Sequence, residues 1–247
     1  MDKLLYVAMS GAKETLRAQA ANNHNLANAS TTGFKADLSA FQSRAVSGPG
    51  YASRVYAQDN VVGWDSSSGG QQQTGNALDL SVNGTGYIAV QDPTGNEAYT
   101  PAGDFHVDPS GQLLSVTGQP VMGDNGPISV PPYSSITVAQ DGSISIVPLG
   151  STAQTSAIVA RIKLVNPPAS TLQRGADGLF HSNSPDPVEA DAATTVTAGT
   201  LESSNVNIAS AMVNMIQLAR QFDMQIKALH SADENAQSAT KLLQSQG

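Results

Sequence analysis

The chain contains no cysteine, few aromatic residues and few charged ones. None of its 247 residues is cysteine, aromatic residues make up 5% and charged residues 13%. The missing cysteine excludes a disulfide framework and a metal site built on thiolates. So few charges and aromatics, together with 22 glycines and 13 prolines, are more typical of turn-rich β structure than of a compact enzyme with a charged surface.

Basic residues are scarce, and their distribution argues against nucleic acid as a partner. The net charge is −8, with four basic and three acidic groups in residues 1–40 and three basic and four acidic groups in residues 201–247. The middle segment therefore carries the whole net charge, whereas binding to duplex nucleic acid needs a basic face. No window of the length of a membrane-spanning helix is continuously apolar, so a membrane span is not expected either.

A cleavable secretory signal is not expected at the start of the chain. The opening apolar run follows Asp2 and gives way to the polar stretch 13–17. At about six residues it is shorter than the apolar region of a signal peptide. If the protein leaves the cytoplasm, another route must carry it.

Proline is missing from both ends of the chain, because all 13 prolines lie between Pro49 and Pro187. Over residues 207–246, apolar positions recur in alternating steps of four and three. This heptad pattern is typical of a helix that buries one narrow stripe against another helix. Its rungs are Ile208, Met212, Met215, Ala219, Phe222, Ile226 and Leu229, continued by Asp233, Ala236, Thr240 and Leu243.

The N-terminal end offers the matching helix, over residues 3 to about 28. Its rungs are Leu5, Met9, Ala12, Leu16, Gln19, Asn23 and Leu26. Four asparagines (Asn22, Asn23, Asn25 and Asn28) crowd its end, although asparagine is a poor helix former. They favour amide contacts to a packed neighbour, with a frayed helix end as the plainer alternative. Because two paired helices enclose no core, neighbouring copies of the chain are expected to cover the remaining apolar faces.

The middle of the chain changes to an alternating, period-two pattern bounded by turn residues. The turns 92–95 and 108–111 share the order Asp-Pro-x-Gly, with glycine where a positive φ is expected. Asn205 or Asn207 is placed to cap the C-terminal helix. Expected strands include 78–82, 87–90, 105–107, 113–115, 128–130, 136–138, 143–147 and 158–165.

A search for catalytic chemistry finds almost nothing. The four histidines are scattered without ligand spacing, and no phosphate-binding loop or nucleophile motif occurs. Gly84-Thr85-Gly86 precedes a strand and is interpreted as a hairpin turn. Asp104, His106 and Asp108 offer a candidate cation site, but ordinary turn chemistry explains them more simply. We therefore predict no enzyme activity, no catalytic residues, no cofactor, no metal and no small-molecule substrate.

These patterns predict an α+β fold: a discontinuous, coiled-coil-like pair of terminal helices and a central all-β, turn-rich domain. The expected boundaries are residues 1–35 and 200–247 for the paired helices, 36–75 for a linker with a possible hairpin near Val55–Trp64, and 76–199 for the β domain. The acidic middle segment is expected to face outward from an assembly of the helices.

Four separated motifs resemble the bacterial flagellar rod and hook protein family. Residues 22–35 (NNHNLANASTTGFK) are similar to its N-terminal signature and residues 199–207 (GTLESSNVN) to its C-terminal signature. Residues 79–87 and 99–105 are similar to its β-domain segments. The resemblance implies a structural subunit that assembles helically in the torque-transmitting shaft of the basal body, in the periplasm. It also implies export by the flagellar type III apparatus without cleavage, and other flagellar axial proteins as partners.

Within the family, the opening residues 1–12 and the segment 212–225 look like the proximal rod branch. Distal rod and hook proteins usually carry an Arg-Ala-Tyr-like triplet where Arg220-Gln221-Phe222 stands here, so a distal rod or hook-type subunit is the nearer alternative. A secreted β-rich hydrolase or carbohydrate-binding module is the alternative from another class. The expected subunit-contact residues are Leu5, Met9, Ala12, Leu16, Asn22, Asn23, Leu26, Asn28, Phe34, Met212, Met215, Ile216, Ala219, Phe222, Ile226 and Leu229.

Overall fold

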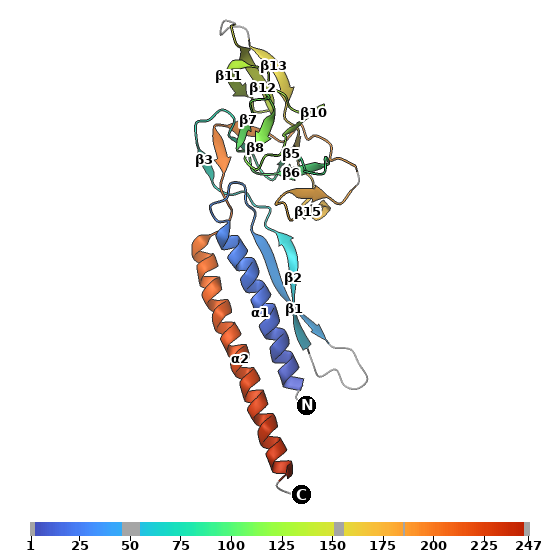
Figure 1. Ribbon diagram of the computed structural model, residues 1–247, viewed down its shortest axis with the longest axis vertical. Coiled ribbons are helices and arrows are strands. Elements are labelled where there is room, and N and C mark those ends of the chain that lie inside the picture. Colours follow the sequence, from blue (N-terminus) through green and yellow to red (C-terminus); the bar gives the residue numbers. More distant parts are fainter. Residues whose placement is uncertain (1–2, 46–54, 151–155, 185, 245–247) are drawn as a thin grey trace. The chain divides into compact units, whose positions relative to one another are not determined.

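The computed structural model describes residues 3–45, 55–150, 156–184 and 186–244. The chain has a helix near each end and a strand-rich region between them, so the α+β prediction is confirmed (Figure 1). It divides into two compact units, each built from separate stretches of chain. The helical unit comprises Met1–Ala29, Ala36–Asp65 and Val206–Gly247, and the β unit comprises Ser30–Lys35 and Ser66–Asn205. Neither described helix has the length and apolar character needed to cross a membrane.

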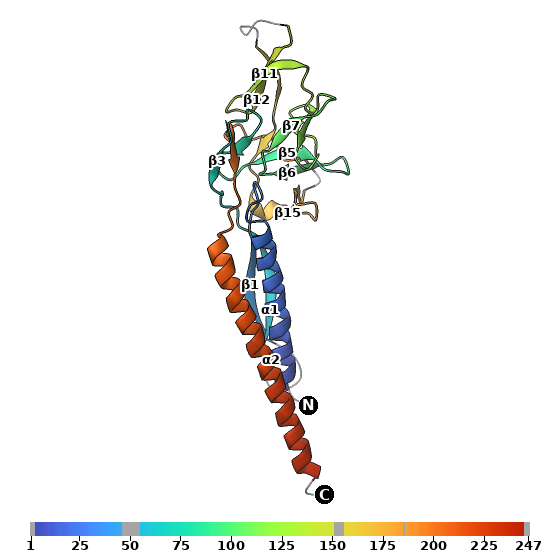
Figure 2. The same cartoon turned by 60° about the vertical axis from the view of Figure 1, so that its left-hand side comes forward.

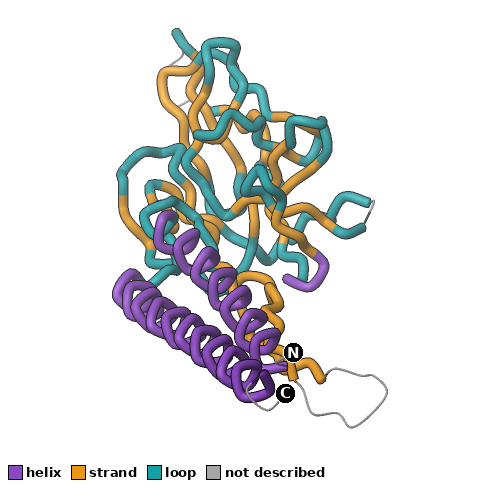
Figure 3. The backbone as a smooth tube through the Cα atoms, turned by 60° about the horizontal axis from the view of Figure 1, so that its bottom comes forward, coloured by secondary structure: helices purple, strands orange, loops and turns teal. Residues whose placement is uncertain are grey.

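The helical unit contains two long helices, α1 (Lys3–Ala27) and α2 (Ile208–Gln244), which lie side by side (Figure 3). Two strands, β1 (Asp37–Ala45) and β2 (Val55–Trp64), pair antiparallel with Asp37 opposite Trp64. This strand pair also packs on α1 (Figure 2). The sequence-based division set 36–75 apart as a linker, whereas the structure groups residues 36–65 with the helices and residues 30–35 with the β unit.

The β unit consists of short strands joined by turns, with one 3-10 turn, η1 (Ala169–Thr171). The strands are β3 (Gln71–Gln73), β4 (Leu80–Val82), β5 (Tyr87–Gln91), β6 (Glu97–Thr100), β7 (Phe105–Val107), β8 (Leu113–Ser115), β9 (Met122–Gly123), β10 (Gly126–Pro127), β11 (Tyr133–Val138), β12 (Ser143–Pro148), β13 (Ala157–Arg161), β14 (Leu164–Val165), β15 (Leu172–Arg174), β16 (Phe180–Ser182), β17 (Val196–Ala198) and β18 (Thr200–Glu202).

The largest sheet has the order β14-β5-β6-β16-β15, and a second sheet has the order β11-β12-β13. Two further pairs, β17 with β4 and β18 with β3, join segments far apart in sequence. One apolar core lies beneath these strands and includes Leu80, Ile88, Val90, Ile144 and Ile162. Closely spaced turns therefore still allow one continuous core, because side chains from many short strands meet in it.

Two local features of the β region differ from a simple alternating pattern. Within the strand expected over 78–82, Ser81 is 0% exposed, because β4 is buried on both faces. Residues 128–130 were expected as a strand. Instead they follow β10 with an isolated bridge between Gln112 and Ser129, and backbone hydrogen bonds join them to Gly111, Leu113 and Val121. Ile128 and Val130 enter the core.

The turn and cap predictions are confirmed. Gly95 and Gly111 have φ of 90° and 89°, values that glycine adopts without the steric cost of a Cβ. In the turn that holds Gly111, the Asp108 carboxylate accepts hydrogen bonds from the Ser110 hydroxyl and the Gln112 amide. Asn207 caps α2, since its Oδ1 accepts a hydrogen bond of 3.0 Å from the Ser210 amide.

Candidate assembly surface on the paired helices

The two helices approach closely and run antiparallel. Near the C-terminal end of α1, Asn22 Nδ2 donates a 2.9 Å hydrogen bond to the carbonyl oxygen of Ala211, near the start of α2. Earlier in α1, a Cβ placed on Gly11 would lie 3.0 Å from side-chain atoms of Gln225, further along α2. Residues earlier in α1 therefore contact residues later in α2, which is the antiparallel arrangement. Glycine at position 11 is what lets the Gln225 side chain come so near.

Small residues make the closest part of this contact. On α1 the buried positions include Ala8, Ala12, Thr15 and Ala18, and on α2 they include Ala211 and Ala232. On α2 the inner stripe, meaning the face toward α1, is Ala211, Met215, Leu218, Phe222, Gln225, Leu229 and Ala232, which are buried or half-buried. Alanine and glycine allow helix axes to lie close together, at the cost of the larger apolar contacts that leucine would supply.

The inner stripe shares only some of its rungs with the heptad ladder predicted from the sequence. Met215, Phe222 and Leu229 belong to both, but Ala211, Leu218 and Gln225 stand where the prediction has Met212, Ala219 and Ile226. On α1 the buried residues are likewise Ala8 and Thr15 rather than Met9 and Leu16. The shift of one residue, about 100° around a helix, turns Met9, Leu16 and Met212 outward.

The structure places the 16 predicted contact residues in three classes. Ala12 and Phe34 are buried, at 7% and 8% exposure. Leu5, Asn22, Leu26, Asn28, Met215, Phe222, Ile226 and Leu229 are half-buried, and Met9, Leu16, Asn23, Met212, Ile216 and Ala219 are exposed. The side chain of Leu243, the last rung of the ladder, lies outside the described residues.

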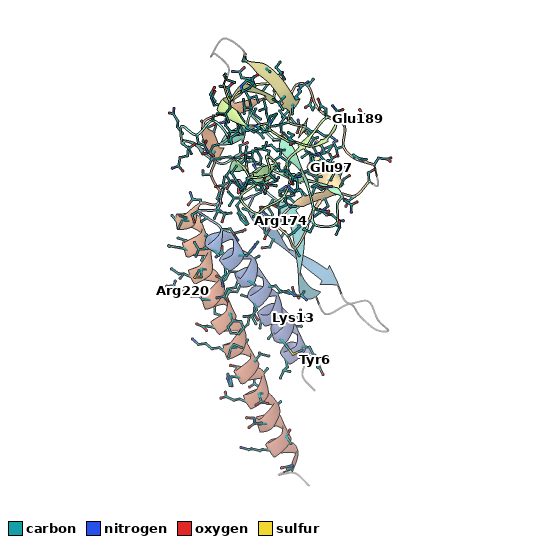
Figure 4. All side chains as sticks on the ribbon, turned by 45° about the horizontal axis from the view of Figure 1, so that its top comes forward. Tyr6, Lys13, Glu97, Arg174, Glu189 and Arg220 are labelled. Atoms are coloured by element: carbon teal, nitrogen blue, oxygen red, sulfur yellow. The ribbon has the colours of Figure 1, made fainter. Side chains whose placement is uncertain are left out.

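An apolar stripe therefore remains uncovered by this chain on each helix. We call the exposed set on α2 the outer stripe: Ile208, Met212, Val213, Ile216 and Met224, each between 48% and 62% exposed. On α1, Tyr6, Met9 and Leu16 are each about half exposed (Figure 4 labels Tyr6). Contiguous exposed apolar side chains rimmed by polar ones mark an interaction surface. Lys13 of α1 and Arg220 of α2, both labelled in Figure 4, are exposed charged residues on the same two helices.

The asparagine-rich end of α1 makes amide contacts to packed neighbours at Asn22 and Asn25. Besides the Asn22 bond to α2, Asn25 pairs with the backbone of Asp37 in both directions. Its Nδ2 donates to the Asp37 carbonyl at 2.9 Å, and its Oδ1 accepts from the Asp37 amide at 2.8 Å. The side chains of His24 and Asp37 also meet, with Nδ1 and Oδ2 2.7 Å apart. These contacts fix the point at which β1 leaves α1.

A cleft of about 460 Å³ lies among α1, the start of β1 and α2 in the helical unit. Its walls carry the amide side chains of Asn22, Asn25, Asn214, Gln217 and Gln221, together with Leu38. Leu38 is 45% exposed. Amides both donate and accept hydrogen bonds, so this cleft adds polar groups to a surface that is otherwise apolar.

A buried ion pair in the β unit joins residues from both signature motifs. Lys35 Nζ lies 2.7 Å from Glu202 Oε1, and the two side chains are 3% and 2% exposed. Glu202 Oε1 also accepts the Gly69 amide at 2.8 Å, while Lys35 Nζ donates to the Ser67 carbonyl at 3.1 Å. Both charges are thus hydrogen-bonded more than once, as a buried charge requires.

Arg174 completes this cluster, and Figure 4 labels it in the β unit. Its guanidinium lies 4.5 Å from the Phe34 ring centre and 5.3 Å from that of Phe180, and it donates to the Lys35 carbonyl at 3.0 Å. The cluster holds Phe34-Lys35 against the β unit. The N- and C-terminal signature motifs include residues 33–35 and Glu202. No motif includes Arg174, so the sequence analysis did not identify Arg174 as part of this cluster.

Among the residues that the structure describes, no group of His, Asp and Glu is arranged to hold a metal ion. The carboxylate of Asp108 is engaged by its own turn, as the plainer interpretation of the Asp104–Asp108 segment holds. A polar cleft of about 360 Å³ is lined by Asp92, Glu97, Tyr99, His181 and Asp186, among others. Glu97 there pairs with Lys163 at 2.8 Å, and the Tyr99 hydroxyl accepts the Val188 amide. Glu97 Oε1 is nevertheless buried without a hydrogen-bond partner among the described residues.

Three family models match successive parts of the chain. Residues 5–35 match "Flagella basal body rod protein", residues 81–146 match "Flagellar hook protein FlgE/F/G D1 domain", and residues 197–242 match "Flagellar basal body rod FlgEFG protein C-terminal". The chain is also 43% identical to the flagellar basal-body rod protein FlgF of Escherichia coli, over 98% of this chain and 99% of the relative. It belongs to the flagellar basal-body rod protein family.

Further relatives agree with the FlgF branch. The FlgF protein of Salmonella typhimurium is 41% identical over 98% of this chain and 99% of its own length. The FlgG protein of Buchnera aphidicola is less similar, at 30% over 89% of this chain and 92% of its own length. The family predicted from the four motifs is thus confirmed, together with its proximal branch, and the hydrolase or carbohydrate-binding alternative is not favoured.

Proposed function

We propose that this rod protein joins neighbouring subunits through the outer stripe of α2, the exposed apolar side chains of α1 and the amide-lined cleft. As an FlgF-type protein it is a structural subunit of the flagellar basal-body rod, in the proximal part. The observation that carries the proposal is that the apolar residues of both helices exceed what the intramolecular contact covers, leaving Met212 and Ile216 52% and 55% exposed.

Assembly of this kind buries what one chain leaves in water. Fully burying a large apolar side chain contributes about 1.5–3 kcal/mol, so several half-exposed residues shared by neighbours stabilise a polymer appreciably. Subunits that meet through different patches, without a closing rotation, form an open helix rather than a ring. Many lateral contacts of moderate strength suit a shaft that transmits torque, and they need no catalytic group. Its partners are then copies of itself and the other axial proteins.

The same proposal includes location and route. As a rod subunit the chain lies in the basal body, and we place it in the periplasm after export by the flagellar type III apparatus without cleavage. The test is the mass of the chain recovered from purified basal bodies, which is expected to equal that of the intact sequence; a shortened N-terminus would overturn it.

The contact surface is tested by placing charge on the outer stripe. Met212→Glu and Ile216→Glu are expected to abolish swimming in cells whose own copy of the gene is deleted, because each puts a carboxylate into an apolar subunit contact. The isolated variants should keep the helical circular dichroism of the parent, since both positions are exposed. Lys227→Glu, which places the same side chain at an exposed position of α2, is the matched control and should still swim. Normal swimming of both stripe variants would overturn the proposal.

A further inference from the structure

Two asparagines of the β unit are each followed by glycine, in the pairs Asn83-Gly84 and Asn125-Gly126, and the chain contains no other Asn-Gly pair. An asparagine modifies itself when the backbone nitrogen of the next residue attacks its side-chain carbonyl carbon, Cγ. Glycine favours this attack because it has no Cβ to obstruct a close approach of the backbone. The two pairs therefore have the same local chemistry, and their surroundings decide how they differ.

Access to the two glycines is equally open. Gly84 has φ of 89° and Gly126 has φ of 118°. Within the described part of the chain, a Cβ built on either glycine would meet no heavy atom within 4 Å beyond its own chain neighbours. Asn83 and Asn125 are both exposed, as residues of turns usually are. Steric access and contact with water therefore do not distinguish the two pairs.

Hydrogen bonds hold the side chain of Asn83 in place. Its Nδ2 donates to the Thr195 hydroxyl at 3.0 Å, and its Oδ1 accepts from the Thr197 hydroxyl at 3.1 Å. Gln71 Nε2 lies 3.4 Å from the same Oδ1. The Asn83 side chain must rotate toward the Gly84 nitrogen before it can react, and that rotation breaks these bonds. Each broken hydrogen bond lowers the population of the reactive arrangement about fivefold.

The side chain of Asn125 makes no hydrogen bond to any other described residue. It lies with Asp124 at the tip of the hairpin that joins β9 to β10, and both residues are exposed (Figure 1 labels β10). The base of the hairpin is anchored, since the Lys163 amide donates to the Met122 carbonyl at 3.0 Å. The Asn125 amide can therefore rotate onto the Gly126 nitrogen without loss of any side-chain hydrogen bond.

We propose that Asn125 is a site of spontaneous deamidation and that its hydrogen bonds protect Asn83 from the same reaction. A bond forms between the Gly126 nitrogen and Asn125 Cγ, and the bond from Cγ to Nδ2 breaks. The proton of the Gly126 amide passes to Nδ2, which leaves as ammonia. Water then opens the cyclic imide: cleavage at Cγ gives aspartate, and cleavage at the main-chain carbonyl gives isoaspartate. The reaction needs no oxidant, cofactor or second subunit, so it is independent of the proposed function.

The products differ from the original chain in charge and in main-chain length. Both add one carboxylate next to Asp124 and take the net charge from −8 to −9. Isoaspartate also adds a carbon atom to the main chain, which conflicts with the two-residue loop that sets Gly123 opposite Gly126. Isoaspartate is the chemical class that carboxyl methyltransferases using S-adenosylmethionine recognise. The deamidated chain, unlike the original one, is then a substrate for an enzyme of that class.

Incubation of the purified full chain in neutral buffer made with heavy-oxygen water tests the proposal. The heavy oxygen marks each asparagine that reacts during the incubation, and mass spectrometry of the peptides gives the rate at each position. Deamidation at position 125 is expected to be at least about tenfold faster than at position 83. A carboxyl methyltransferase with labelled S-adenosylmethionine should modify the peptide that contains position 125. Equal rates at the two positions, or a faster reaction at position 83, would overturn the proposal.

Two controls show whether the structure sets the difference. A chain carrying both Thr195→Val and Thr197→Val lacks the hydroxyls that hold Asn83, so the reaction at position 83 should accelerate at least about fivefold. The rate at position 125 should not change. In urea, which unfolds the chain, the two rates should become similar. A ratio as large in urea as in the folded chain, or an unchanged rate at position 83 in the double variant, would show that these hydrogen bonds do not protect Asn83.

Discussion

The helical unit and the β unit bury their residues in opposite ways. The β unit encloses large apolar side chains completely, with Leu80, Ile88 and Ile144 all 0% exposed. The helical unit buries mainly small residues between its elements and leaves larger ones half in water. The charges differ as well: eight basic and eight acidic residues balance in the helical unit, and the β unit carries four basic and twelve acidic residues. One unit closes its core within a single chain, and the other leaves large apolar residues exposed, which we propose that neighbours cover.

The difference explains how one chain can be both a stable domain and part of a polymer. A closed core stabilises the β unit whether or not other subunits are present. If neighbours bind the helical unit as proposed, its stability depends on the concentration of those partners, because binding to the folded form stabilises that form.

The largest expected effect comes from the buried ion pair of the β unit. Lys35→Met or Glu202→Leu alone leaves an uncompensated charge in a buried site, which costs about 3–5 kcal/mol of the free energy of unfolding. The double variant should be more stable than either single one, although it leaves the Gly69 amide and the Ser67 carbonyl without these partners. Hydrogen exchange read peptide by peptide in the full chain measures the loss within residues 66–205.

A matched control for the Lys35 and Glu202 variants is Lys163→Met, since Lys163 pairs with Glu97 but is 14% exposed. It should cost less than Lys35→Met because solvent compensates part of the remaining charge. Equal losses from the two lysine variants, or a double variant that is the least stable of the set, would contradict the view that Lys35 and Glu202 act as one closed pair.

One type of substitution compares the two units directly. Ile144→Ala removes a side chain with 0% exposure from the β core, and Ile216→Ala removes one with 55% exposure from α2. The first should lower the free energy of unfolding by about 2–5 kcal/mol. The second should change it by no more than about 0.5 kcal/mol in the isolated chain but reduce incorporation into basal bodies. Thermal unfolding and the yield of assembled rods are the two measurements.

The outcome of that pair separates stability from assembly. If Ile216→Ala destabilises the isolated chain as much as Ile144→Ala does, the outer stripe is part of the fold of one chain. If it leaves both stability and incorporation unchanged, the stripe is an ordinary exposed surface. The proposed subunit contact requires that Ile216→Ala leave the stability of the isolated chain nearly unchanged and reduce its incorporation into basal bodies.

The sequence predicted which residues are helical far better than which face of each helix is buried. Heptad steps identify an apolar stripe along the helix. Where two apolar residues are adjacent, as Ala211 and Met212 are, the pattern favours the larger one as the buried residue. The structure buries the alanine instead, since a Cβ on Gly11 would nearly touch Gln225 and the helices lie close at small residues. The Lys35–Glu202 pair was also invisible locally, because 167 positions separate its members. Contacts of that range depend on the tertiary fold, which period and composition do not encode.

A smaller effect is expected at the junction of α1 with α2. Asn22→Ala removes the amide that donates to the Ala211 carbonyl and should cost about 1 kcal/mol, the usual contribution of one hydrogen bond. Asn23→Ala is the matched control, because Asn23 is the adjacent residue and exposed. Hydrogen exchange near residues 208–215 should be faster in Asn22→Ala than in the parent. In Asn23→Ala it should be unchanged. Equal effects of the two variants would instead mean that a general change in helix propensity accounts for both.

The smallest expected effect is the pH dependence of stability that the turn carboxylates of the β unit cause. Hydrogen bonds from the Ser110 and Ser143 hydroxyls lower the pKa of Asp108 and of Asp141, and the Ala193 amide does most to lower that of Asp191. A lowered folded-state pKa gives stability that is present above the ordinary value, about 4, and is lost as the pH falls through the folded value. Burial raises the pKa of Asp104 and acts in the opposite direction.

The pKa of Asp92 is lowered as well. With four carboxyls lowered against one raised, the β unit should unfold at lower temperature as the pH drops from about 4 toward 2. Ser110→Ala and Ser143→Ala remove hydroxyls that stabilise two of the ionised carboxylates, so each should make the fall shallower while lowering stability at neutral pH. Melting curves of the full chain against pH, with hydrogen exchange to assign the transition to residues 66–205, provide the measurement. A steeper fall in either serine variant would show that groups other than these turn carboxylates govern the acid response, and the sharp division in charge between the two units would then not extend to their behaviour in acid.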